Sequence, residues 1–313
     1  MKHSNHTISS LELTFAMILS GTIGYFVISS GQVFWNVVFF RCVIGAMVLG
    51  GYAYFSGLIR AEFFQPRVLL LIVLGGITLV GNWVLLFASF NYIPFSIATV
   101  AYHMQPLFLV LASTLITREK PSISLLVWLA LAFVGLVLIV ELNPHELHEL
   151  FIGDLNRTDS SALFGLLLAL GAALLYTATT LITKKVSQVP STFVALVQVI
   201  VGILMLLPFA DFDNLPTQTS QWLDLLILGA ILTGFMYIIM YDSFQKLPTS
   251  LIALLSFIYP ITALFVDHFA FSTHISVTQI LGVIMILIAV SAVKFHWRLP
   301  LSASKKSMRE KKL

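Results

Sequence analysis

Ser89-Phe90-Asn91-Tyr92-Ile93-Pro94-Phe95-Ser96 decides the fold of this chain, because the pattern returns 154 residues later as Ser243-Phe244-Gln245-Lys246-Leu247-Pro248-Thr249-Ser250. At the same ungapped offset Pro106 falls on Pro260 and Gly135 on Ala289, so the spacing is kept over about 47 positions. A fixed offset of this kind indicates a duplicated unit, and duplicated hydrophobic units are common in membrane transporters.

The composition is that of a membrane protein. Hydrophobic residues make up 58% of the 313 residues, charged residues only 10%, and the mean hydropathy is +0.97, which excludes a soluble chain of this length. Stretches long enough to cross a hydrocarbon core of about 30 Å recur throughout, and backbone groups in lipid must be satisfied within each segment, so each stretch is expected to be a helix. The ten predicted helices are 12–30, 34–55, 68–90, 96–116, 123–141, 162–184, 191–210, 221–242, 249–267 and 276–295.

The Lys and Arg residues predict the orientation. With the N-terminus in the cytoplasm, fifteen of the seventeen basic residues fall in inside segments, as the positive-inside rule requires. The other two are Arg157, in an outside loop, and Arg41, within a helix. The inside residues are Lys2, Arg60, Arg67, Arg118, Lys120, Lys184, Lys185, Lys246, Lys294, Arg298, Lys305, Lys306, Arg309, Lys311 and Lys312. We therefore expect both termini in the cytoplasm.

Five helices per half is an odd number, so the second half must be inverted relative to the first, an arrangement typical of transporters. We expect an all-α integral membrane protein with a first five-helix repeat (1–141), a periplasmic connecting loop (142–161), a second, inverted repeat (162–296) and a basic cytoplasmic tail (297–313). The tail is interpreted as an anchor near anionic lipid and not as a nucleic-acid site. The single cysteine, Cys42, excludes a disulfide within the chain.

Two prolines lie about ten residues inside their helices, at matching places in the two halves. Pro106 and Pro260 must kink or locally open the helix, because proline lacks an N–H and its ring clashes with the preceding turn. Irregular backbone near the bilayer midplane is where transporters bind substrate. The two prolines are therefore predicted hinges, and kinks kept only for packing are the alternative.

The motifs of several chemistries are missing. No GxxxxGK[ST] loop occurs, which argues against direct ATP-driven pumping. Neither HExxH, paired cysteines nor a cluster of membrane-embedded carboxylates is present, and GxSxG is absent as well. We therefore expect no enzyme activity, no metal site and no cofactor.

What remains is a polar and aromatic set at similar depth. At a rise of about 1.5 Å per residue, Arg41 lies roughly 10 Å along the second helix from its outer end, and Asn82 and Trp83 lie about 12 Å below the outer surface in the third. Charged groups at this depth usually face a cavity or a partner. The predicted substrate-binding residues of the first half are Arg41, Asn82, Trp83, Tyr102, His103 and Gln105. Those of the second half are Tyr176, Gln198, Tyr237 and Tyr259.

Several of these residues have a second interpretation. Arg41 either lines a cavity, snorkels outward, or pairs with the C-terminal carbonyls of a neighbouring helix. His103 is either a proton-coupling group, because its unperturbed pKa is close to physiological pH, or a hydrogen-bonded packing residue. Trp83 at mid-depth favours a cavity lining over a lipid-facing position, since lipid-facing tryptophans gather at the interfaces.

The joint spacing of these features resembles the drug/metabolite transporter superfamily, and its EamA-type permeases in particular. The family's arginine in the second helix is matched by Arg41 in Phe39-Phe40-Arg41-Cys42. Its proline and the glutamate at the inner end of helix four are matched by Pro106 and Arg118-Glu119-Lys120. The second half has Pro260 but lacks the glutamate, with Phe-Ser-Thr around Phe271 in its place. The resemblance covers essentially the whole chain.

The resemblance implies a multi-pass carrier of the bacterial inner (cytoplasmic) membrane, with helices of both halves around a central cavity. Its fold does not fix the substrate. An aromatic lining from Trp83, Tyr102 and Tyr237 suits an amphipathic solute, and Arg41 suits a carboxylate. The hypothesis is a secondary transporter for an amino acid or similar metabolite, exporting it by alternating access.

Several alternatives stay open. They are a vitamin or other metabolite importer of the same fold, and a membrane-embedded sensor without flux. A lipid-modifying enzyme lacks candidate residues, and a channel lacks a visible filter. The expected partners are the small-molecule substrate and the lipid bilayer, with protons as a candidate coupling ion, no nucleic acid, and either a monomer or a homodimer.

Overall fold

The computed structural model describes residues 2–119, 121–142, 160–295 and 297, and helices dominate throughout these ranges. Ten helical segments among them are long and apolar enough to cross a membrane. The first half contains α1 (Lys2–Gly21) with α2 (Ile23–Ser29), α3 (Phe34–Phe55), η1 (Ala61–Phe64), α4 (Pro66–Ser89), α5 (Phe95–Tyr102) with α6 (Gln105–Thr117), and α7 (Ile123–Val140). The second half contains α9 (Ser160–Lys185), α10 (Ser191–Leu206) with η2 (Leu207–Phe209), α11 (Thr219–Leu226) with η3 (Ile227–Phe235) and α12 (Met236–Lys246), α13 (Thr249–Leu255) with α14 (Ile258–Phe271), and α15 (Val277–Lys294).

The ten segments agree with the predicted helices to within a few residues, except at the N-terminus. There the helix begins at Lys2 and not at residue 12, because its first turns are polar and a search for apolar stretches misses them. Most of the predicted connecting loop (142–161) and of the basic tail (297–313) lies outside the described residues.

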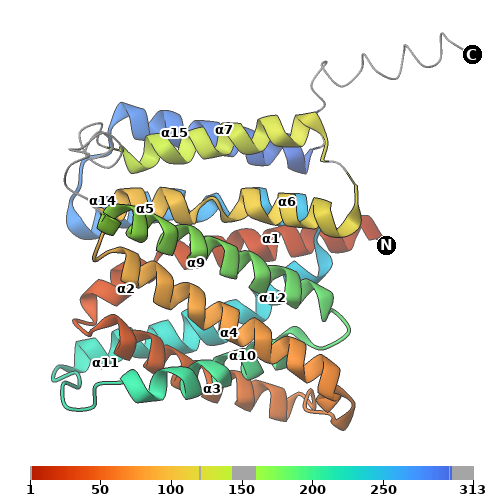
Figure 1. The fold of residues 1–313 in the computed structure, drawn as a ribbon, viewed down its shortest axis with the longest axis vertical. Coiled ribbons are helices and arrows are strands. Elements are labelled where there is room, and N and C mark those ends of the chain that lie inside the picture. Colours follow the sequence, from red (N-terminus) through yellow and green to blue (C-terminus); the bar gives the residue numbers. More distant parts are fainter. Residues whose placement is uncertain (1, 120, 143–159, 296, 298–313) are drawn as a thin grey trace, which may run out of the picture.

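The two halves run in opposite directions. In Figure 1 the first turn of α1 and the last turn of α15 lie at the same edge of the bundle, the right-hand edge, whereas α9 starts at the opposite edge. We call the edge that holds the first turn of α1 the N-terminal side. Because each half has five spans, the second repeat is inverted, as predicted.

The duplication extends to the ends of single helices. Ser122 caps α7 by accepting a hydrogen bond from the Leu125 amide at 3.1 Å, and 154 residues later Ser276 caps α15 in the same way at 3.1 Å from the Gln279 amide. Arg118 and Ser272, also 154 residues apart, end α6 and α14 in the left-handed region, with φ of 59° and 55°. The offset seen in the sequence is therefore an offset of backbone conformation.

The fourth and ninth spans are interrupted at their prolines. The fourth breaks after Tyr102 and resumes at Gln105, and the ninth breaks after Leu255 and resumes at Ile258. Each break falls about four residues before the proline, where its ring would clash with a helical carbonyl and its missing N–H leaves that carbonyl without a partner. The prediction that Pro106 and Pro260 open their helices is confirmed.

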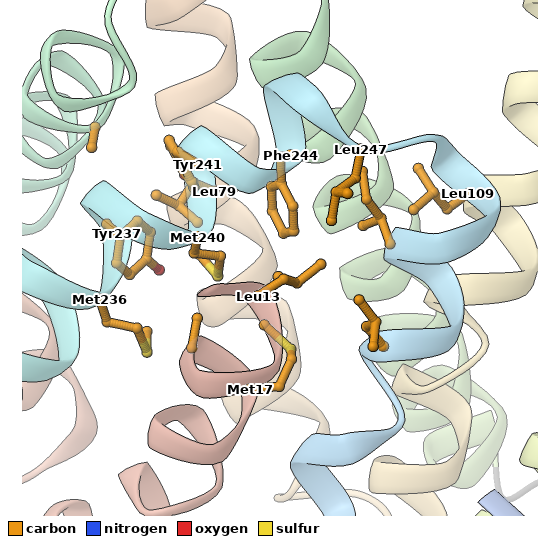
Figure 2. Close-up of a cluster of buried hydrophobic side chains, with 14 of the residues drawn as sticks. Leu13, Met17, Leu79, Leu109, Met236, Tyr237, Met240, Tyr241, Phe244 and Leu247 are labelled. Carbon is orange, nitrogen blue, oxygen red and sulfur yellow. The ribbon is translucent and has the colours of Figure 1, made fainter. Parts of the chain in front are cut away.

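Close packing holds the repeats together. The fifth and tenth spans, α7 and α15, lie side by side at one end of the bundle (Figure 1), and a Cβ added at Gly135 would lie 2.7 Å from the Gly282 carbonyl oxygen. Near the centre, Leu13 and Met17 of α1 pack against Met236 and Met240 of α12 in one buried cluster (Figure 2). Contacts of this kind between small or flexible side chains are the usual basis of helix association in lipid.

Candidate functional site

A layer of buried and half-buried polar and aromatic side chains crosses the middle of the bundle, next to the two helix breaks. It draws residues from α3, α4, α5, α9, η3, α12 and α14, and therefore from both repeats. We call it the central polar layer, and it consists of Arg41, Asn82, Trp83, Tyr102, His103, Tyr176, Thr233, Tyr237 and Tyr259.

Arg41 is the cation of this layer. Its side chain is only 4% exposed, its Nε donates a hydrogen bond to Thr233 Oγ1 at 3.1 Å, and its Cζ lies 5.1 Å from the centre of the Trp83 ring. The outward-snorkelling alternative does not fit these contacts. Among the described residues no carboxylate pairs with Arg41. A buried guanidinium held only by a hydroxyl and an aromatic face retains unmet capacity for an anion.

The partner of Arg41 lies in a π-helical segment, Ile227–Phe235, which the sequence reasoning missed. Thr233 Oγ1 donates to the Leu228 carbonyl, five residues earlier, at 2.7 Å while it accepts from Arg41. Close approach makes this possible, because a Cβ on Gly45 would lie 2.8 Å from the Thr233 methyl group. Short π segments are frequent at functional sites. In the structure this span is 28 residues long, against 24 for the matching third span, but the predicted ranges 221–242 and 68–90 carry no such difference.

Four tyrosines approach one another on the other side of the layer. Tyr102 donates a hydrogen bond to Asn82 Oδ1 at 3.0 Å, and its ring stacks on Tyr176 with centroids 6.2 Å apart. Tyr176, Tyr237 and Tyr259 are all close enough to Tyr102 to interact with its hydroxyl electrostatically. The four tyrosines come from the broken fourth and ninth spans and from the continuous sixth and eighth spans, and they bring aromatic faces and hydroxyl groups to one region.

His103 sits at the break in the fourth span and is 6% exposed. Its Nδ1 lies 2.8 Å from the Thr99 carbonyl oxygen, which can only accept, so Nδ1 carries the proton and Nε2 is free to accept. The ring stacks on Tyr259 with centroids 5.4 Å apart. The packing and proton-coupling interpretations of His103 are both compatible with these contacts.

Gln105 and Gln198 lie apart from the contacts of Arg41 with Thr233 and Trp83. Gln105 is buried, and its backbone carbonyl accepts a hydrogen bond from Thr177 Oγ1 at 3.3 Å. Gln198 is fully buried and accepts from the Tyr241 hydroxyl at 2.6 Å, while its Nε2 has no partner. Tyr241 in turn lies 5.1 Å, ring centre to ring centre, from Tyr237, which links Gln198 to the layer.

The described residues offer no metal centre, since no three His, Cys, Asp or Glu side chains among them gather closely enough to hold an ion. The arrangement instead suits reversible binding of a polar solute between the two repeats.

Comparison with known proteins supports this fold. The model of the EamA-like transporter family matches residues 28–141 and 163–294, once in each repeat. The chain is 28% identical over 277 residues to an uncharacterized transporter, YxxF, of Bacillus subtilis (strain 168), covering 88% of this chain and 86% of the relative. A solved crystal structure of a protein superposes with a TM-score of 0.78 at 19% identity, over 93% of this chain and 99% of the other, and it supports the fold alone.

The matched ranges take in eight of the ten spans entirely, all but the first residue of the sixth, and the end of the first. They cover well over half of the sequence and include every residue of the central polar layer. The chain therefore belongs to the EamA-like transporter family and is a multi-pass membrane transporter built from two inverted five-helix repeats.

Proposed function

We propose that this protein is a secondary transporter that exports a small amphipathic carboxylate, an amino acid or similar metabolite, across the bacterial inner membrane by alternating access. The observation that carries the proposal is the buried guanidinium of Arg41, which contacts Thr233 and Trp83. The distribution of lysine and arginine supports cytoplasmic termini.

The geometry around Arg41 favours a carboxylate over other polar groups. Thr233 occupies Nε and Trp83 covers one face, which leaves the terminal amino groups of the guanidinium for a ligand. A carboxylate accepts two parallel N–H bonds from such a group, and hydrogen bonds to charged partners contribute about 1.5–3 kcal/mol each. The neighbouring tyrosine and tryptophan faces suit an apolar or aromatic portion of the solute.

The construction of the layer supports alternating access. Its residues come from both repeats, so any rocking of one repeat against the other changes the distances across the layer. The breaks before Pro106 and Pro260 are the places where backbone can bend at low cost, and we assign them the hinge role. His103, beside the first break, is the candidate group for linking this motion to protons.

The proposal is tested by comparing an acid with its neutral amide. Radiolabelled phenylalanine is the first probe, and saturable uptake into proteoliposomes should be inhibited by carboxylic acids and at least tenfold less by phenylalaninamide. Arg41→Ala should lower uptake of the acid more than tenfold, because removing one partner of a buried charge pair costs about 2–5 kcal/mol. Arg60→Ala, which removes an exposed guanidinium outside the layer, is the matched control and should transport normally.

Two outcomes would overturn the carboxylate assignment. One is equal inhibition by acid and amide in the parent protein. The other is full transport by Arg41→Ala, which would remove Arg41 from the site.

A further inference from the structure

A groove on the N-terminal side of the bundle lies apart from the central polar layer. Its volume is about 730 Å³, and it opens between α1, α3, α10 and α12, with the connection between α3 and α4 at its rim. In the proposed orientation it faces the cytoplasm. None of its lining residues belongs to the layer around Arg41.

Glu12 is the unusual residue of this groove. It lies within the first span, His6–Ser29, and lines the groove from α1. Its Oε2 atom is fully buried and has no hydrogen-bond partner. An ionisable group within a membrane span is costly unless a partner satisfies it, which makes such a group a functional candidate by default.

The cations around Glu12 are paired with other groups. On α12, Lys246 pairs with Asp242, and at the rim Arg60 pairs with Glu62 at 3.5 Å. Of the other helices packed on α1, α13 contributes no charged side chain, and α14 carries Asp267 and His268 near its C-terminal end. Among the residues that the structure describes, the groove is lined by more carboxylates than cations, and Glu12 is the lining carboxylate without an ion pair.

The walls of the groove define what kind of cation it suits. The described residues contain no cluster of His, Cys, Asp and Glu that could hold a metal ion, and a volume of about 730 Å³ is that of an organic ligand and not of an ion. Tyr52, Phe63 and Ile238 give it aromatic and apolar surface beside the carboxylate. Aromatic faces next to an anion favour an ammonium group that carries an apolar tail.

We infer that this groove is a second binding site, which takes amphipathic amines with Glu12 as the counter-ion of the ammonium group. This amine site is separate from the proposed carboxylate site, because Glu12 and Arg41 lie at different depths along the membrane normal. Glu12 is six residues from the N-terminal-side end of its span, or about 9 Å, and Arg41 is seven residues from the opposite end of its own, or about 10 Å. In a core of about 30 Å they are separated by roughly 10 Å along the membrane normal, too far for one α-amino acid to bridge.

The test is equilibrium dialysis of tritiated phenethylamine against the full chain in lipid nanodiscs, with empty nanodiscs as background. We expect saturable binding and at least tenfold weaker competition by N-acetylphenethylamine, which keeps the apolar part but has no charge. Glu12→Gln should weaken binding about tenfold, the size expected for losing a hydrogen bond to a charged group. Glu119→Gln removes the same charge from an exposed position outside the groove and should leave binding within twofold.

Variants also separate this site from the carboxylate site. Arg41→Ala should leave amine binding within twofold, whatever its effect on transport. If Glu12→Gln fails to fold, Glu12→Asp and the comparison between the amine and its acetylated form still decide the question.

The inference is overturned by any of four results. These are no saturable binding, equal competition by the neutral compound, equal effects of Glu12→Gln and Glu119→Gln, or loss of amine binding in Arg41→Ala.

Discussion

Thr233→Val probes how the central polar layer is held together. Valine keeps the shape of threonine, so the change removes a hydroxyl without opening a cavity. The hydroxyl accepts from Arg41 Nε at 3.1 Å and donates to the Leu228 carbonyl at 2.7 Å. Losing a hydrogen bond to a buried charged donor costs about 1.5–3 kcal/mol, and the second bond adds about 0.5–1 kcal/mol, so we expect a total loss of about 2–4 kcal/mol in the free energy of unfolding.

The assay is reversible unfolding in mixed micelles, run as a double-mutant cycle with Arg41→Leu. If the account is right, Thr233→Val costs about 1.5–3 kcal/mol less when Arg41 is already replaced, because the charged donor is then gone. Thr180→Val is the matched control. Thr180 is also fully buried, but among the described residues its hydroxyl bonds only to the Tyr176 carbonyl of its own helix, at 2.9 Å. Its replacement should cost about 0.5–1 kcal/mol with no coupling to Arg41. Equal costs at the two threonines, or a coupling energy near zero, would refute the reasoning.

Three further predictions concern the frame around the layer. Gly282→Ala should lower the unfolding temperature, with a cost of about 1–3 kcal/mol in the free energy of unfolding, because the new Cβ would lie 2.4 Å from a backbone oxygen of α7. Gly24→Ala is the control and should leave the unfolding temperature unchanged, because a Cβ there meets nothing within 4 Å. An equal effect of the two substitutions would contradict the packing argument. Hydrogen bonds from Ser276 and Thr278 hold the pKa of Glu141 below its ordinary value of 4.5. The ionised carboxylate therefore stabilises the fold at higher pH, and this stabilisation is lost as the pH falls through and below about 4.5. In Glu141→Gln this part of the pH dependence of thermal unfolding should disappear. Tyr102→Phe should leave the unfolding free energy within about 1 kcal/mol but raise the KM for transport, since it removes only the hydrogen bond to Asn82; an unchanged KM would place Tyr102 outside the binding site.

Much of the frame follows from the sequence because the determining forces are local or act along the membrane normal. Apolar length marked the spans, and the offset between Pro106 and Pro260 located both breaks. The same offset holds at Ser122 and Ser276, where a side chain caps the helix that follows it. Each of these signals is carried by a few neighbouring residues.

What escaped prediction depends on contacts between distant helices. The π segment exists in a span whose composition is ordinary, and it matters because Thr233 reaches Arg41, 192 residues away in the chain. The sequence places Gln198 among the candidate binding residues together with Arg41, and in the structure its amide lies against Tyr241 and Gly75. Depth along a helix can be counted from the sequence, whereas the direction in which a side chain faces is set by which helices pack against it.

The measurement that tests the central claim most directly is counterflow in proteoliposomes with radiolabelled amino acids and small metabolites. The account predicts saturable uptake of one class of solute, accelerated by unlabelled solute on the other side and lost on replacing Trp83 or Tyr102. Folded protein that moves none of these compounds would contradict the claim that the central polar layer carries amino acids or similar solutes, and it would favour a sensor without flux.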